Sequence, residues 1–289
     1  MKECIFCHKI KEDNQFNKEH ILLEALGGKG SENMIDCVCI ACNSAMGETI
    51  DANFVNTDII KYIRFNLKIK GKGGIPNPFK GHKVNYDDTF IKGELITNKE
   101  GEISAFRADY HADTEKGIYI SPKKDLVKYV NGKRKEMKLP PFEEQYIKSH
   151  TLSIKTPKIP HINDITISEI KPLEIYSCPV FFKMAYELCF KILGKNYLKD
   201  PIAIDINKFL YYIYHEKKLD NLCCPTSISI DFKDNITKPS NILSISLYAL
   251  DGKIYSDINL YELLKAKICV SETLDIYKDF KNYILKISV

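Results

Sequence analysis

The pattern of apolar and polar positions is clearest in the C-terminal half of the chain. Between residues 180 and 193, apolar side chains recur at i, i+3 and i+4, which is the period of a helix that buries one face. Gly194 follows directly, in the position where a left-handed residue commonly ends a helix. Residues 206–215 predict a second helix. The apolar positions of the first helix are Phe182, Ala185, Tyr186, Cys189, Ile192 and Leu193.

Shorter segments have the apolar or alternating pattern of β-strands. Asp251-Gly252 separates two of them and predicts a two-residue hairpin turn, because both residue types tolerate a left-handed backbone. Residues 261–267 and 276–285 fit a helix or a strand equally well. The predicted strands are 90–97, 102–110 (after a turn at 98–101), 165–175, 227–232, 242–250 and 253–258.

The composition is that of a folded, non-membrane protein. The chain has 289 residues, of which 44% are apolar and 28% charged, so it can bury a core. No stretch approaches the ~18 uninterrupted apolar residues of a membrane span, and the N-terminus has no apolar leader segment. We therefore expect a cytoplasmic protein. In a reducing cytosol, its ten cysteines favour metal binding or burial over disulfides.

Two CxxC pairs stand close to the N-terminus. Cys4 and Cys7 are followed, after 31 intervening residues, by Cys39 and Cys42. Two such pairs are typical of a tetrahedral zinc site with four thiolate ligands, which has no open position and is therefore structural. Cys37 offers another ligand, but the spacing of 39 and 42 is the standard one. The alternative to a zinc site is that these are ordinary reduced cysteines that bind no metal.

The segment between and just after these pairs contains groups suited to phosphodiester cleavage. Glu19 and His20 are adjacent at the end of a short predicted strand. A histidine can take a proton from water near neutral pH, and a carboxylate can hold a hard divalent ion. Asn43, near the start of a helix, can add an amide oxygen. Each of these residues taken alone has a common non-catalytic explanation. A Glu-His pair usually lies on the surface without a function, and an Asn in this position usually caps the helix.

The order of these motifs resembles the HNH endonuclease family in its zinc-containing form. The resemblance covers about residues 4–51 and depends on C-x2-C, E-H-I, A-L-G-G, a central Asn and C-x2-C-N-x3-G in this order. It implies a treble-clef fold in which a β-hairpin and a helix grip one catalytic metal, Mg2+ or Mn2+. It also implies hydrolysis that leaves 3′-hydroxyl and 5′-phosphate ends.

The resemblance implies a role for individual residues. His20 matches the general base, Glu19 the metal ligand before it, and Asn33 the asparagine that braces the loop between the strands. Asn43 matches the last position of the family name, where Asn often replaces His as a metal ligand. Asp51, two turns along the helix, is the other candidate for that ligand. The structural zinc ligands are matched by Cys4, Cys7, Cys39 and Cys42.

Positive charge is concentrated after this module rather than in it. Residues 1–51 contain five Lys or Arg and nine Asp or Glu, a balance of −4. Residues 59–86 contain seven basic residues, no acidic residue and interleaved aromatics, and residues 116–138 add eight basic residues. Such segments can contact phosphates, although a solvated lysine-rich surface gives the same pattern. The predicted nucleic-acid contacts are Lys61, Arg64, Lys68, Lys70 and Lys72.

These features predict an α+β protein in three parts. Residues 1–56 are a zinc-bound ββα nuclease module, and residues 57–150 are a basic, strand-rich region that contacts nucleic acid and becomes loop-like over 121–150. Residues 151–289 are a mixed α/β domain that could position DNA, form a homodimer or sense a signal.

The leading hypothesis is a metal-dependent endonuclease that cuts double-stranded DNA, in restriction, phage defence or a mobile element. One alternative is an RNA-cleaving or nonspecific, toxin-like nuclease with the same site. Another is a non-catalytic zinc module that only binds nucleic acid or protein.

Overall fold

The computed structural model divides into two compact units. The core unit contains residues 1–73 and 170–289, and the inserted unit contains residues 74–169. The structure describes residues 1–71, 73–81, 84–85, 92–113, 118–121, 125–151, 173–218, 223–233, 239–277 and 279–289.

The N-terminal part of the core unit is a β-hairpin followed by a helix. Strand β3 (Phe16–His20) pairs antiparallel with β4 (Met34–Cys39), and α1 (Ile40–Met46) begins directly after β4. These elements therefore follow one another in ββα order. The other elements of this part are β1 (Lys2–Glu3), β2 (Ile10–Lys11), η1 (Asp13–Gln15), η2 (Glu24–Leu26), η3 (Ser31–Asn33), a π-helical turn η4 (Gly47–Asp51), α2 (Ala52–Val55) and α3 (Asp58–Asn66).

Two long helices from the C-terminal segment form the middle of the core unit. In α6 (Leu173–Leu193), every residue from 179 to 189 is buried, whereas α7 (Pro201–Glu216) buries mainly one face. Asp200 caps α7, because its carboxylate accepts a hydrogen bond from the backbone N–H of Ile202 at 3.0 Å.

A five-stranded antiparallel sheet packs against these helices, with the strand order β10-β13-β12-β11-β14. Every second residue of β12 is buried, as expected for a sheet with one face on the core. The strands are β10 (Ile228–Phe232), β11 (Ile242–Leu250), β12 (Lys253–Leu260), β13 (Leu264–Ser271) and β14 (Tyr283–Ser288), and η7 (Leu274–Ile276) lies between the last two.

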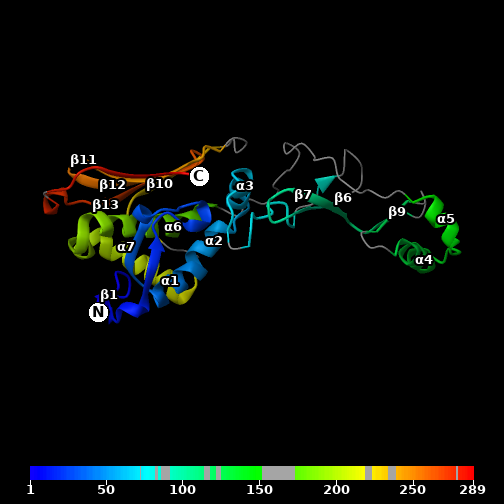
Figure 1. Ribbon diagram of the computed structural model, residues 1–289, viewed down its shortest axis with the longest axis horizontal. Helices are drawn as coiled ribbons and strands as arrows, with labels where there is room; N and C mark the ends of the chain where they lie inside the picture. Colours follow the sequence, from blue (N-terminus) through cyan, green and yellow to red (C-terminus); the bar gives the residue numbers. More distant parts are fainter. Residues whose placement is uncertain are drawn as a thin grey trace. The chain divides into compact units, whose positions relative to one another are not determined.

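The core unit has three layers (Figure 1). The sheet lies on one side of α6 and α7 and contacts both helices through β13, while the hairpin module lies on the other side and contacts them through α1 and α2. Because α6 is enclosed from both sides, it can be apolar around its whole circumference. One hydrophobic cluster runs through all three layers, so the N-terminal module shares its core with the C-terminal segment.

The inserted unit contains small antiparallel sheets and two helices that contact each other. Helix α4 begins after Asp125, which accepts a hydrogen bond from the Lys128 backbone N–H at 3.0 Å. The Arg134 guanidinium lies over the Phe142 ring at 3.6 Å. The elements are β5 (Val84–Asn85), β6 (Lys92–Thr97), β7 (Ile103–Ala108), β8 (His111–Asp113), β9 (Ile118–Ile120), α4 (Leu126–Glu136) and α5 (Glu144–Ser149).

The predicted α+β class is confirmed, and most elements predicted from apolar periodicity are present. The predicted helices lie within α6 and α7, and Gly194 ends α6 with a φ of 73° and opens η6 (Gly194–Lys199). Asp251 and Gly252 both have positive φ in the turn between β11 and β12. The two ambiguous segments contribute to strands, β13 and β14.

Other sequence predictions differ from the structure or are not tested by it. The loop predicted for 121–150 is wrong, because α4 and α5 fall there; Asp125 and the Arg134–Phe142 contact stabilise helices whose apolar stripe is too weak to be recognised. Of the strand predicted at 165–175, residues 165–172 lie outside the described residues. Residues 173–175 are the start of α6 and not part of a strand. The treble-clef assignment and the division into 1–56, 57–150 and 151–289 stay predictions.

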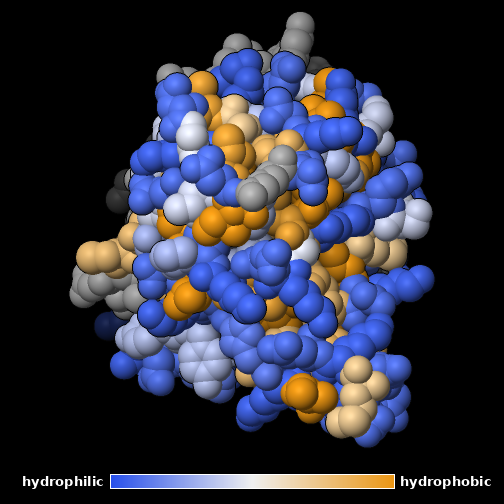
Figure 2. Space-filling model, turned by 90° about the vertical axis from the view of Figure 1, so that its left-hand side faces the viewer, coloured by the Kyte–Doolittle hydropathy of each residue, from blue (hydrophilic) through white to orange (hydrophobic). Residues whose placement is uncertain are grey.

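The surface shown in Figure 2 is mostly hydrophilic, with hydrophobic residues in small groups between the polar ones. Such scattered apolar exposure is ordinary for a folded protein. Among the described residues, none of the helices has both the length and the apolar character needed to cross a bilayer.

Candidate metal centre and nuclease site

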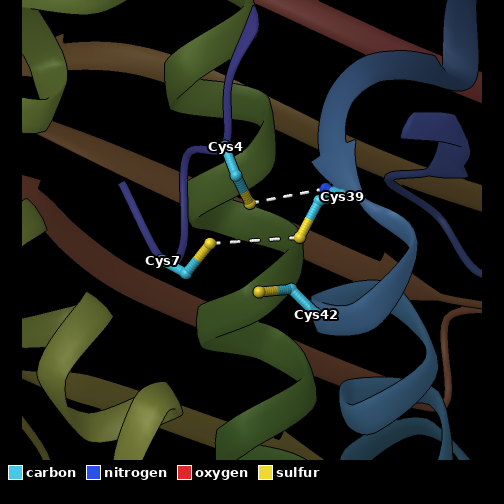
Figure 3. Close-up of side chains that lie close together, drawn as sticks. All are labelled: Cys4, Cys7, Cys39 and Cys42. Carbon is cyan, nitrogen blue, oxygen red and sulfur yellow. Dashed lines mark hydrogen bonds between the residues drawn. The ribbon is translucent and has the colours of Figure 1, made fainter. Parts of the chain in front are cut away.

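Four cysteine thiols converge beside the β-hairpin (Figure 3). Their sulfur atoms all lie within 4.8 Å of one another, and the Sγ atoms of Cys7 and Cys39 are 3.9 Å apart. A tetrahedral zinc site with Zn–S bonds of ~2.3 Å requires sulfurs about 3.8 Å apart. The four predicted ligands therefore come together in a group that can bind one zinc ion. They are Cys4, Cys7, Cys39 and Cys42.

The thiols of the cluster differ in pKa: burial raises the pKa of Cys7, and the hydrogen bond to Cys4 raises that of Cys42. A hydrogen bond from the Cys42 thiol, supported by backbone N–H groups, lowers the pKa of the Cys4 thiol to about 4, although burial opposes this shift. Lys11 Nζ donates to Cys39 Sγ at 3.0 Å. An ammonium at this distance stabilises negative charge on sulfur, so it would offset part of the charge of four thiolates around one metal ion.

Two further residues near the cluster, Cys37 and His8, lie in different surroundings. Cys37 is not part of the group of four, and burial is the main cause that raises the pKa of its thiol to about 12. The ring of His8 is held by Asn207, whose Nδ2 lies 2.8 Å from the histidine Nε2. The pair with the standard spacing, Cys39 and Cys42, is the one that joins Cys4 and Cys7 in the cluster.

Asn33 holds the loop that joins β3 to β4. The residue is fully buried; its Oδ1 accepts from the Leu22 N–H at 2.7 Å, and its Nδ2 donates to the carbonyls of Leu22 and Gly28 at 2.7 and 3.0 Å. A Cβ on Gly28 would lie 1.9 Å from the Leu22 carbonyl oxygen, so only glycine allows this close approach. These contacts fix the chain immediately after His20.

Glu19 and His20 occupy the last two positions of β3, opposite Ile35 and Met34. His20 is partly exposed, as a general base that meets water must be. Glu19 is buried, and its Oε1 accepts a hydrogen bond from Lys183 Nζ at 2.7 Å. The same ammonium donates to Asp51 Oδ2 at 2.8 Å. Lys183 thus joins the two acidic residues that the sequence identified as metal-ligand candidates.

A fourth titratable residue, Glu187, lies one helical turn after Lys183 and is fully buried. Burial raises its pKa well above the usual carboxyl value, with Lys183 as the opposing influence. Burial would lower the pKa of Lys183, but its acidic neighbours, Asp51 first, outweigh burial and raise that pKa. The surroundings therefore favour the charged form of the lysine and the protonated form of Glu187.

Asn43 has a different neighbour from Glu19. Its Nδ2 donates to Asn17 Oδ1 at 3.0 Å, which links the first turn of α1 to the start of β3. The donor end of the amide is used in this bond, so its oxygen is the end that can serve a cation. Asn17 was not among the residues selected from the sequence.

Lys183 was also missed, although a signal for it exists. A lysine that is buried in the apolar part of a predicted helix must be paired, because an isolated buried charge is very costly. The sequence could therefore have indicated an acidic partner for Lys183. It could not have indicated which one, since the partners found here lie 132 and 164 positions away.

The predicted nucleic-acid contacts are in mixed environments. Lys68 and Lys70 are exposed, and Lys61 pairs with Asp58 at 3.6 Å. Arg64 is buried, and burial lowers the pKa of its guanidinium. Lys72 lies outside the described residues, as do Lys116, Lys123 and Lys124 of the second basic segment. The phosphate-contact roles of these residues stay predictions.

Comparison with known proteins agrees with the resemblance seen in the sequence. The HNH endonuclease family model matches residues 4–59, which span the thiol cluster, the hairpin, α1 and Asp51. No curated protein matches the chain, and no solved structure matches it. Residues 4–59 are therefore similar to an HNH endonuclease domain, and this similarity points to nuclease activity and a nucleic acid substrate.

Proposed function

We propose that the chain is a metal-dependent endonuclease that hydrolyses phosphodiester bonds of double-stranded DNA, with His20 as the general base. The observation that carries this proposal is the position of His20 within the matched HNH segment. It is partly exposed at the end of β3, and the Asn33 bonds fix the loop that follows it.

In this mechanism, His20 takes a proton from the water that attacks phosphorus. Glu19 and Asn43 would hold the catalytic divalent ion, Mg2+ or Mn2+, which would stabilise the developing charge and the leaving 3′-oxygen. Asn33 keeps the loop in register, so that His20 faces the substrate from a rigid strand. Each group acts from the hairpin or from the helix that follows it.

The four-cysteine cluster serves a different purpose in this proposal. A zinc ion bound by four thiolates has no open coordination position, so it stabilises the module and does not take part in hydrolysis. The proximity of the four sulfurs and the Lys11 ammonium beside Cys39 support this role. The module thus uses two metal ions, one structural and one catalytic.

The basic segments after the module supply phosphate contacts. The matched domain itself is acidic over residues 1–51, so it needs positive charge from elsewhere in the chain to hold DNA. Exposed lysines at 68 and 70 are the first candidates. Restriction, phage defence or a mobile element would use such an activity, and residues 151–289 would position DNA, form a homodimer or sense a signal.

A plasmid-cleavage assay tests the proposal. Wild-type protein is expected to nick or linearise supercoiled plasmid with Mg2+ or Mn2+, and EDTA in excess should stop the reaction. His20→Ala should reduce the rate by about 10²- to 10⁴-fold, the usual contribution of a positioned base. His8→Ala is the matched control, because His8 is an exposed histidine of the same module.

The same assay separates the alternatives. Faster cleavage of RNA than of plasmid would change the substrate class but keep the site. Binding without cleavage by wild-type protein, unchanged in His20→Ala, would contradict the nuclease proposal and favour a non-catalytic zinc module.

A further inference from the structure

A buried lysine from helix α6 lies directly behind the nuclease hairpin. Lys183 Nζ is 2.7 Å from Glu19 Oε1 and 2.8 Å from Asp51 Oδ2, and the lysine side chain has 0% exposure. The two carboxylates belong to the matched HNH segment, whereas the lysine lies 132 or more positions further along the chain. The C-terminal segment therefore contributes a charged group to this domain.

The burial of Lys183 limits what it can do. A fully buried ammonium does not reach a phosphate in solvent, so any effect on the reaction passes through the groups that it touches. Those groups are Glu19, which precedes the proposed base, and Asp51, which ends the π-helical turn η4. Lys183 can therefore position the site without contacting the substrate.

The geometry at Glu19 allows it to serve two cations. A carboxylate has two oxygens, and Lys183 donates to Oε1 from the interior. The other oxygen can then be offered to a divalent ion, while the inner bond fixes the orientation of the carboxylate. Hydrogen bonds of this kind orient metal ligands in many proteins, and their loss commonly costs about 10- to 100-fold in metal affinity or activity.

The carboxyl groups around Lys183 outnumber it. Glu19 Oε1 and Asp51 Oδ2 both accept a hydrogen bond from its one ammonium. Asp51 Oδ1 is buried, with no hydrogen-bond partner among the described residues. Each of the two carboxyl groups thus keeps one oxygen that Lys183 does not use.

We propose that Lys183 is a positioning residue of the nuclease site, which holds Glu19 from the interior so that its other oxygen can bind the catalytic divalent ion. This inference rests on the proposed function. It makes α6 a required part of the nuclease site, although α6 lies outside the segment that the HNH family model matches.

The test compares the full-length wild type with Lys183→Met, which keeps the length of the side chain and removes the charge. We expect the Mn2+ dissociation constant, measured by calorimetry without substrate, and the Mn2+ concentration for half-maximal plasmid cleavage both to rise about 10- to 100-fold, with an unchanged zinc content. A merely structural defect would lower the amount of active protein, but would not shift this concentration.

Lys191→Met is the matched control. Lys191 lies on the same helix and donates to the backbone carbonyls of Glu32 and Met34, so its loss removes a contact between α6 and the module without touching Glu19. This variant should keep the wild-type Mn2+ dependence. If Lys183→Met does not fold, Lys183→Arg is the second variant, because it keeps the charge but moves the hydrogen-bond donors. An increased Mn2+ concentration for half-maximal cleavage in this variant supports the proposal.

The outcomes separate the two proposals. Wild-type protein that cleaves no nucleic acid contradicts the proposed function itself. If the wild type cleaves and the folded Lys183 variant has an unchanged Mn2+ dependence, Lys183 is not a positioning residue. A lower half-maximal concentration would mean that the lysine competes with the metal, which also overturns the inference.

Discussion

Two polar centres flank the β-hairpin of this protein, and they are built in opposite ways. The thiol cluster uses four like residues within the first 42 positions, all from the N-terminal module. The lysine cluster joins Glu19 and Asp51 of that module to Lys183 of α6. The first centre can be completed by a metal ion, whereas the second is completed by another part of the chain.

This difference determines how each centre depends on the fold. A metal ion gathers ligands from a short, otherwise marginal segment, because the energy of binding is also the energy of folding. A buried ion pair has no such external partner, and its charges must be brought together by packing that is already favourable. The hydrophobic cluster shared by all three layers provides that packing.

The largest effect is expected from breaking the thiol cluster. Cys39→Ser should abolish zinc binding and unfold the hairpin module, because structural zinc contributes on the order of 10 kcal/mol in small zinc-binding peptides. Zinc content and thermal unfolding are the measurements. Cys37→Ser, two residues away and outside the cluster, should bind zinc like the wild type; equal zinc content in both variants would contradict the assignment.

A smaller but still large effect is expected at the lysine cluster. Asp51→Ala removes one of the two partners of a buried ammonium, and breaking a buried pair costs about 3–5 kcal/mol. Urea unfolding should show this loss while the zinc content is unchanged. Asp58→Ala, which breaks the more exposed pair with Lys61, should cost less than about 1 kcal/mol. Similar losses of unfolding free energy in both variants would mean that the buried lysine cluster contributes no more to stability than the exposed pair.

The smallest effect is a change in pH dependence at Glu187. Because burial raises its pKa well above the usual carboxyl value of about 4.5, the folded protein keeps a proton that the unfolded chain loses near that pH. Its contribution to stability is therefore present below pH ~4.5 and is lost as pH rises toward the folded pKa. Glu187→Gln mimics the protonated form, so it should match the wild type at pH 4 and be more stable at pH 8. Unfolding by urea at both values checks this, and an equal difference at both would contradict it.

The sequence predicted the thiol cluster well because its information is local. The spacing of each CxxC pair places two sulfurs on one turn, and the standard spacing distinguished Cys39 with Cys42 from Cys37. The long helices and the sheet strands were also predictable, since each has its own period of apolar positions. Loop prediction failed at α4, where the stabilising contacts are a cap at Asp125 and the stacking of Arg134 on Phe142.

The chain by itself thus determined which four cysteines form one cluster, the order of the hairpin and helix, and the position of His20 in a segment that matches the HNH endonuclease family. Only the tertiary structure decided that Glu19 and Asp51 share Lys183, and that α6 lies between the module and the sheet. The physical reason is that a spacing rule acts over a few residues. The pairing of a buried charge, by contrast, is decided by whichever distant element the hydrophobic core brings beside it.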